Sequence, residues 1–319
     1  MKKKKGAGAI AMAVEELALF GTALLFAVMA VSVANNMGVI IGPGSSTRIL
    51  RPNTLRLLSI AGLVLGYVIE GWKVRADVGL SVDGEIVASL TVLIFLGVLT
   101  LFGRATSITQ LMFAFVVGVS VARGDRSSLG FVTEVLTYWL VAIVLSVLAS
   151  LLITSFMKGR GPFSVLGSIT VLKGVTLVMI FSMAYVLGAN TLGFVASFVP
   201  SPAGPVSVFA ALSGIVVGAY MTDVRGSVYS TGLVGLRYVS SLTPYVSAML
   251  LTEVGTQLGV PLPLSMSVFF GLIGSALAMR LRIIPYRKVI HYFMTAWLAP
   301  FLFMVFVSWL LYRLLPLQL

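Results

Sequence analysis

Long apolar segments constrain this chain more than any other feature of its sequence. They recur from one end to the other, and each is about 20 residues long, which is the length that a helix needs to cross a bilayer. We identify about ten of them, at 8–34, 55–72, 86–103, 106–122, 129–157, 167–188, 205–222, 239–258, 264–280 and 289–314. Because every backbone polar group must be hydrogen-bonded in lipid, the sequence predicts an all-α polytopic membrane protein.

The composition agrees with this fold class and limits the partners. Hydrophobic residues make up 59% of the chain and charged residues 10%, against about 45–50% and 25% in soluble domains. The formal charge is +12, but the 22 Lys and Arg residues lie mostly in short loops beside apolar segments, where lipid headgroups and topology account for them. We predict a multi-pass protein of the cell membrane with lipid partners and no nucleic acid. A homodimer is a candidate assembly.

The basic N-terminus resembles the start of a signal peptide. Lys2 to Lys5 precede an apolar run, but Glu15 and Glu16 interrupt this run, and it continues to Val33, beyond the length of a signal peptide's apolar region. We therefore predict that this segment is the first membrane helix.

An internal duplication organises the chain. Asn35 and Asn190 each follow an alanine at the end of a long apolar stretch, and they lie 155 positions apart. Two glycine pairs, Gly103 with Gly259 and Gly118 with Gly274, are 156 positions apart. We therefore expect an N-terminal transmembrane repeat, 1–160, and a C-terminal one, 161–319, which meet in the polar loop from Lys158 to Pro162.

The number of segments predicts the relation between the repeats. Each repeat holds about five, and an odd number of crossings gives the inverted-topology arrangement of many secondary transporters, in which ligands bind near the midplane beside broken helices. Glycines and prolines after each Ala-Asn pair predict where the helices break: Gly38, Gly42, Pro43 and Gly44, then Gly193, Pro200, Pro202 and Pro205.

The two Ala-Asn pairs form the first candidate site, which consists of Asn35, Asn36, Asn190 and Thr191. An amide at the end of a broken helix offers a donor and an acceptor to a ligand, and carbonyl oxygens nearby can coordinate a cation. Alternatively, the asparagines satisfy helix ends inside the bundle. The repetition favours a cation or helix-break site, with Na+ or H+ as the candidate coupling ion, no other metal and no cofactor.

Hydroxyl clusters at equivalent places form the second candidate site. Ser107 and Thr109 lie in the first repeat, and Ser265 and Ser267 lie in the second. Hydroxyls can donate to an oxyanion, although they are also ordinary contacts between membrane helices. Arg104, beside the first cluster, is an anion ligand if its turn reaches the midplane and a loop charge if the turn lies at the surface. We take these five residues as candidate substrate ligands.

Catalytic signatures are scarce. His291 is the single histidine and lacks a metal-binding motif, and the chain has neither a cysteine nor a phosphate-binding loop. Glu134, Lys173 and Glu253 fall within apolar segments, where an ionisable group is either functional or part of an ion pair. We expect no enzymatic activity.

The candidate residues resemble motifs of the inorganic phosphate transporter (PiT) family. Each half of that family carries a G-A-N-D-x-A-N signature and a later L-G-x-P-x-S-T-T-H segment. Parts of these resemble V-A-N-N from Val33, G-A-N-T from Gly188, S-I-T-Q from Ser107 and L-G-V-P from Leu258. The stretch from Gly218 to Pro244 is similar to the link between the family's motifs. The resemblance implies cation-coupled uptake of phosphate by two related halves.

Departures from the family motifs bear on coupling. The signature aspartates are replaced by Asn36 and Thr191, and the histidines by Gln110 and Met266. The resemblance therefore implies that either the cation coupling or the substrate has changed. A tetrahedral oxyanion is still favoured.

We predict a secondary transporter of an inorganic oxyanion, with phosphate ahead of sulfate, that works by alternating access. Asn35, Ser107, Asn190 and Ser265 should converge around one polar cavity near mid-depth. One alternative is a transport-inactive or regulatory relative, which the lost aspartates suggest. Another is an intramembrane enzyme acting on a lipid phosphate, which would need acids, His or Lys clustered at one membrane face.

Overall fold

The computed structural model describes residues 2–47, 50–75, 80–102, 106–124, 126–158, 165–201, 204–222, 238–280 and 286–314. These residues form helices and turns, with no strand among them. The helices are α1 (Lys2–Thr47), α2 (Pro52–Glu70), α3 (Val82–Leu101), α4 (Ile108–Arg123), α5 (Arg126–Lys158), α6 (Val165–Val186), α7 (Gly193–Ala196), α8 (Pro205–Met221), α9 (Tyr238–Gln257), α10 (Leu264–Ala278), α11 (Tyr286–Phe293) and α12 (Ala299–Leu314). A 3-10 turn, η1 (Gly71–Lys73), follows α2, and two π-helical segments, η2 (Leu187–Leu192) and η3 (Met294–Leu298), precede α7 and α12.

Six helical stretches of the described chain are long and apolar enough to cross a membrane, and the protein is a multi-pass membrane protein. Each of the ten predicted apolar segments corresponds to a helical stretch among the described residues, but α4, α8 and α10 are shorter than the six stretches that are long enough to cross. At 1.5 Å per residue, the 16 residues of α4 and the 15 of α10 extend about 22–24 Å, less than the roughly 30 Å of the hydrocarbon core. The prediction that each segment is long enough to cross is therefore corrected for these helices.

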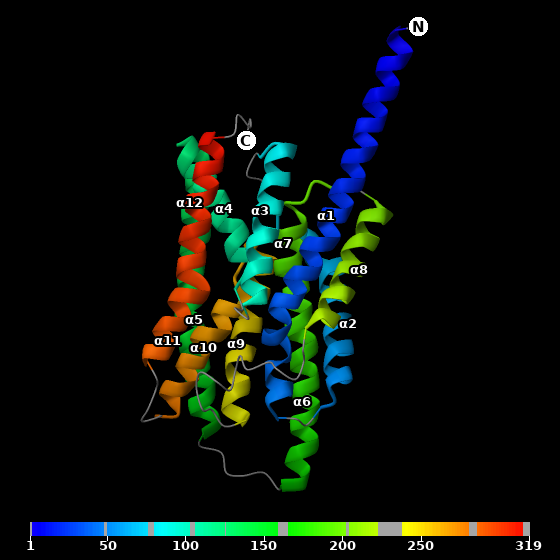
Figure 1. The fold of residues 1–319 in the computed structure, drawn as a ribbon. Coiled ribbons are helices and arrows are strands. Elements are labelled where there is room, and N and C mark those ends of the chain that lie inside the picture. The colour runs from blue at the N-terminus through cyan, green and yellow to red at the C-terminus, as the bar shows by residue number, and fades with distance from the viewer. Residues whose placement is uncertain are drawn as a thin grey trace.

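The helices α4 and α10 are the second arms of two hairpins. The α3–α4 hairpin occupies the upper part of the molecule and the α9–α10 hairpin the lower part, and in each hairpin the chain reverses near the middle of the molecule (Figure 1). The residues that lead into the second helix of each hairpin are buried: Thr106 and Ser107 before α4, and 260–263 before α10. The two short helices are short because the chain turns back inside the bundle.

The most extensive helix contacts join elements of opposite halves. Helix α1 packs on α8, α2 on α6, α4 on α12 and α5 on α10. Two mixed bundles result, one of α1, α2, α6 and α8 and one of α4, α5, α10 and α12, and Figure 1 shows them on opposite sides of the molecule.

Glycine pairs allow two of these contacts to be close. Gly62 and Gly66 on α2 face α6, and Gly214 and Gly218 on α8 face α1; each pair has the G-x-x-x-G spacing of close membrane-helix packing. A Cβ added at Gly66 would lie 1.9 Å from a backbone oxygen of α6, and one at Gly218 would lie 2.3 Å from a backbone oxygen of α1.

The other two contacts, of α4 with α12 and of α5 with α10, each contain one glycine of the repeated pair Gly118 and Gly274. A Cβ at Gly118 on α4 would lie 2.3 Å from the carbonyl oxygen of Val305. A Cβ at Gly274 on α10 would lie 2.2 Å from that of Val147 on α5. The two glycines therefore have equivalent packing roles. Gly103, of the other pair, lies outside the described residues.

One predicted helix break does not occur. Helix α1 continues through Asn35 and the following glycines to Thr47. Gly44 serves packing instead, because an added Cβ would lie 2.6 Å from the side chain of Leu55 and 2.8 Å from that of Ile180. In the second half the irregularity is the π-helical η2, which contains Asn190.

Candidate functional site

Asn35 fastens α1 to the reversal between α3 and α4. Its Nδ2 donates to Oγ1 of Thr100 at 2.8 Å, and its Oδ1 accepts from the backbone N–H of Thr106 at 3.1 Å. Thr100 is at the end of α3, and Thr106 is in the turn before α4. One amide thus holds both sides of the hairpin.

Asn190 does the same in the second half. Its Nδ2 donates to Oγ1 of Thr256 at 3.2 Å and to the carbonyl oxygen of Val260 at 3.0 Å, and its Oδ1 accepts from the N–H of Leu262 at 2.9 Å. Thr256 and Leu262 each lie 156 positions after their counterparts in the first half. The hydrogen bonds are repeated along with the sequence. Both amides thus bond to groups at a chain reversal of their own half.

The two predicted sites meet at Thr109 and Thr191. Oγ1 of Thr109, on the first turn of α4, donates to Oγ1 of Thr191, in η2, at 3.3 Å, and both side chains are buried. The sequence offset relates Thr109 to Ser265 and Thr191 to Asn36. Asn36 is also buried and donates from Nδ2 to the carbonyl oxygen of Ser32, in its own helix, at 2.9 Å.

The first turns of α4 and α10 carry the remaining predicted ligands. Ser107 caps α4 by accepting from the N–H of Gln110 at 3.4 Å, whereas Pro263 gives α10 no side-chain cap. Ser265 and Ser267 are buried on α10, and the carbonyl oxygen of Ser267 accepts from Ser146 Oγ at 2.6 Å.

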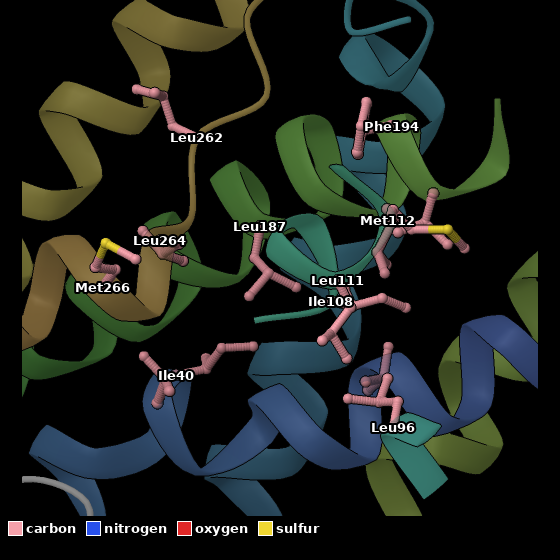
Figure 2. Packing of buried hydrophobic residues seen from close by; sticks show 14 of the residues in the cluster. Ile40, Leu96, Ile108, Leu111, Met112, Leu187, Phe194, Leu262, Leu264 and Met266 are labelled. Atoms are coloured by element: carbon pink, nitrogen blue, oxygen red, sulfur yellow. The ribbon is translucent and has the colours of Figure 1, made fainter. Parts of the chain in front are cut away.

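Both helix starts are drawn beside η2. In Figure 2, Ile108 at the start of α4 and Leu264 at the start of α10 are drawn on either side of Leu187, the first residue of η2, and all three belong to one buried cluster. Helix N-termini carry partial positive charge and N–H groups without a partner in the helix, so this region favours an anion.

The buried polar groups of the described chain are electrically neutral. They consist of Ser, Thr, Asn and Gln, and the described residues contain no group of three His, Cys, Asp or Glu side chains that could hold a metal ion. An anion here would be bound by hydroxyls and N–H groups, and a cation by neutral oxygens. Arg104, the predicted charged ligand, lies outside the described residues.

The buried polar atoms that lack a hydrogen-bond partner among the described residues include Oγ1 of Thr106, Oε1 of Gln110 and Nε1 of Trp297. An unmet buried donor or acceptor costs about 1–3 kcal/mol, so each of these atoms calls for an explanation. The sequence signal for Gln110 was its place in the hydroxyl cluster. Nothing in the sequence pointed to Trp297, because only the fold brings it to α4.

The other ionisable candidates lie away from this group. Glu134 and Lys173 are exposed on the bundle surface. Glu253 accepts from Nε2 of Gln257 at 2.6 Å, and the same nitrogen donates to Glu70 at 3.2 Å. The hydrogen-bond partner of Glu253 among the described residues is therefore a neutral amide, where the ion-pair interpretation expected a basic side chain.

Two pockets among the described residues are lined by side chains other than the candidate ligands. One of about 350 Å³ is lined by Tyr185, Glu253 and neighbouring residues of α6 and α9. Another, of about 390 Å³, lies against Trp72, Arg75 and Gly193. Of the residues expected to converge, Asn35 and Asn190 are hydrogen-bonded to the hairpin of their own half, and the contact of Thr109 with Thr191 joins the two candidate sites.

Comparison with known proteins identifies the fold. No protein family model and no curated protein matches the sequence. A solved structure described as "The sodium-dependent phosphate transporter" matches with a TM-score of 0.70 and 15% identity, over 95% of this chain and 98% of that one. The chain therefore has the fold of that transporter structure, as the sequence resemblance predicted.

Proposed function

We propose that the protein is a secondary transporter of an inorganic oxyanion, with phosphate favoured over sulfate. The observation that carries this proposal is the buried hydrogen bond between Thr109, on the first turn of the short helix α4, and Thr191, in the π-helical segment η2. The two segments come from opposite halves, as in transporters that bind substrate between repeats. The name of the solved structure with this fold supports phosphate as the substrate.

The proposed anion ligands are neutral. Ser107, Thr109, Ser265 and Ser267 would contribute hydroxyls beside the N–H groups of the first turns of α4 and α10. Arg104 remains a proposed ligand from the segment between α3 and α4. Neutral donors can bind an anion tightly when they are fixed in place before it arrives, because little reorganisation is then needed.

Coupling to a cation is the second part of the proposal. Oxygen atoms of Asn36 and Thr191, with nearby carbonyls, would hold Na+ or take part in H+ coupling. Without a carboxylate in this group the cation is held weakly, so we propose weak or absent sodium dependence.

Alternating access would then move the mixed bundles. We propose that 1–160 and 161–319 are inverted repeats, which the opposed hairpins support. Because the closest packing joins the halves to each other, the bodies that move would be the bundle of α1, α2, α6 and α8 against the bundle of α4, α5, α10 and α12.

Phosphate flux tests the proposal. Purified full-length protein in liposomes should take up radiolabelled phosphate in a saturable manner, and Thr109→Val should weaken apparent affinity about tenfold, as expected for a lost hydrogen bond to a charged ligand. Thr137→Val is the matched control, because Thr137 is exposed and bonds only within α5. Phosphate binding without flux would favour a transport-inactive relative, and release of phosphate from a lipid would favour an enzyme.

A further inference from the structure

We propose that Gln110 and Trp297 form the part of the substrate site that separates phosphate from sulfate, with Gln110 accepting a hydrogen bond from the anion and Trp297 donating one to it. This inference rests on the proposed transport of an oxyanion, and it adds the recognition of the anion's own proton. Neither residue was among the ligands predicted from the sequence.

The two residues link the first turn of α4 to helix α10. Nε2 of Gln110, on α4, donates to the carbonyl oxygen of Trp297 at 3.2 Å. The indole of Trp297 packs edge-on against Phe269 of α10, with ring centroids 4.6 Å apart. Trp297 is fully buried and lies in the π-helical segment η3, a type of irregularity that is frequent at functional sites.

Their remaining polar atoms form a complementary set. Nε1 of Trp297 can only donate, and Oε1 of Gln110 can only accept; both are buried, and neither has a partner among the described residues. Gln110 itself is only 4% exposed. The hydroxyl of Thr106, just before α4, can both donate and accept, and it too is buried without a partner among the described residues. A ligand bound by these groups would offer acceptor oxygens to Trp297 and a proton to Gln110.

Protonation distinguishes the two oxyanions. At neutral pH inorganic phosphate retains at least one proton, so it can donate to Gln110 Oε1 while its other oxygens accept from Trp297 and the hydroxyls. Sulfate retains no proton, so it would place a charged oxygen against an amide oxygen that needs a donor. Rejection by an unmet buried polar group is stronger than rejection by shape.

Three variants act on the two anions in different ways. Gln110→Leu removes the acceptor and should lower phosphate affinity about tenfold more than sulfate affinity. Gln110→Glu places a carboxylate there and should raise the ratio of phosphate to sulfate affinity about tenfold or more, because the carboxylate accepts the phosphate proton and repels sulfate. Trp297→Phe removes a donor common to both and should weaken both anions about tenfold, with the ratio unchanged.

Competition binding of radiolabelled phosphate and sulfate to the purified full-length chain measures these ratios. The same measurement with arsenate, which retains a proton, and selenate, which does not, repeats the comparison. Trp309→Phe is the control for Trp297→Phe, since Trp309 lies partly exposed on α12. Thermal unfolding without ligand checks that each variant folds.

The outcomes separate this inference from the proposed function. If the unmodified chain binds neither anion, the proposed transport function fails. If it binds them and the ratio is the same in Gln110→Leu and Gln110→Glu, the inference is overturned, and the unmet atoms are then satisfied by buried water. Opposite changes of the ratio in the two Gln110 variants would support it, and a failure of one variant to fold leaves the other as the test.

Discussion

At the scale of single residues, Asn35 and Asn190 each hold a chain reversal that lies about 70 positions further along the chain. Each amide uses its donor and its acceptor on one chain reversal, where backbone groups would otherwise be buried without partners. No water is present in the hydrocarbon core to replace those bonds. The amides therefore make buried turns tolerable within a membrane protein.

Removing either amide should destabilise the fold. We expect Asn190→Ala to lower the free energy of unfolding by about 2–3 kcal/mol, because it leaves the N–H of Leu262 buried without a partner, and Asn35→Ala to lower it by about 1–2 kcal/mol. Denaturation of the detergent-solubilised protein measures both. Asn53→Ala, at an exposed asparagine, should change the value by less than about 0.5 kcal/mol. Equal stability in all three would show that the amides are not structural.

Asn36 is the residue at which cation coupling can be restored. A carboxylate attracts a monovalent cation at 4 Å by about 4 kcal/mol at an effective dielectric of 20, before desolvation is subtracted. Phosphate uptake by the unmodified protein should depend weakly or not at all on sodium, and Asn36→Asp should strengthen the dependence. The measurement is uptake into liposomes with and without a sodium gradient. Steep sodium dependence of the unmodified protein would contradict this account, because other groups would then supply the charge.

At the scale of elements, the sequence predicts the helices better than their ends. The apolar segments could be located because lipid requires long apolar runs. The hairpins could not, since the turn before α4 is held by a hydrogen bond to Asn35, which is remote in the sequence. Likewise, the glycines after Asn35 resemble a helix break, and only the neighbouring helices show that Gly44 serves packing.

The candidate site residues likewise divide into those that a local sequence pattern predicts and those that depend on remote contacts. The repeated Ala-Asn pairs and hydroxyl clusters were visible because duplication marks them in the sequence. Trp297 was not visible, because its contact with Gln110 joins α4 to η3 across the two halves.

The glycine contacts give a prediction for whole helices. Gly66→Ala and Gly218→Ala should each lower the free energy of unfolding by about 1–3 kcal/mol, because the new methyl group meets backbone of the facing helix. Gly97→Ala in α3 is the control: nothing lies within 4 Å of its added Cβ, and it should be neutral or stabilising by up to about 1 kcal/mol. Chemical denaturation of the three variants checks the order, and an equal loss in Gly97→Ala would refute the packing explanation.

At the scale of the whole molecule, the duplication is present in packing as well as in sequence. The offset of about 155 residues relates α1 to α6 and α2 to α8, so the contact of α1 with α8 corresponds to that of α6 with α2. In the same way, α4 corresponds to α10 and α5 to α12, so the contact of α4 with α12 corresponds to that of α10 with α5. This reciprocity is what a pseudo-two-fold relation between the halves would produce, and it supports the proposed inversion.

Opposed hairpins predict opposed labelling. Arg123 ends α4, and Met279, 156 positions later, follows the end of α10. The chain contains no cysteine, so Arg123→Cys and Met279→Cys can each be introduced alone. We expect a membrane-impermeant maleimide added outside sealed vesicles to label one of them and, after permeabilisation, both. Labelling of both from the same side would exclude inverted repeats.

Because helices of the first half pack on helices of the second, these contacts can form only late in synthesis. Helix α1 packs on α8, and the chain from Thr47 to Met221 must be made before that contact can form. At about 5–20 residues per second this takes on the order of 10–35 s. Throughout that interval the face of α1 that α8 will cover is in contact with lipid or with whatever other helix is nearby. For this protein, mispairing is therefore a hazard of biogenesis, and it ends only when the second half has entered the membrane.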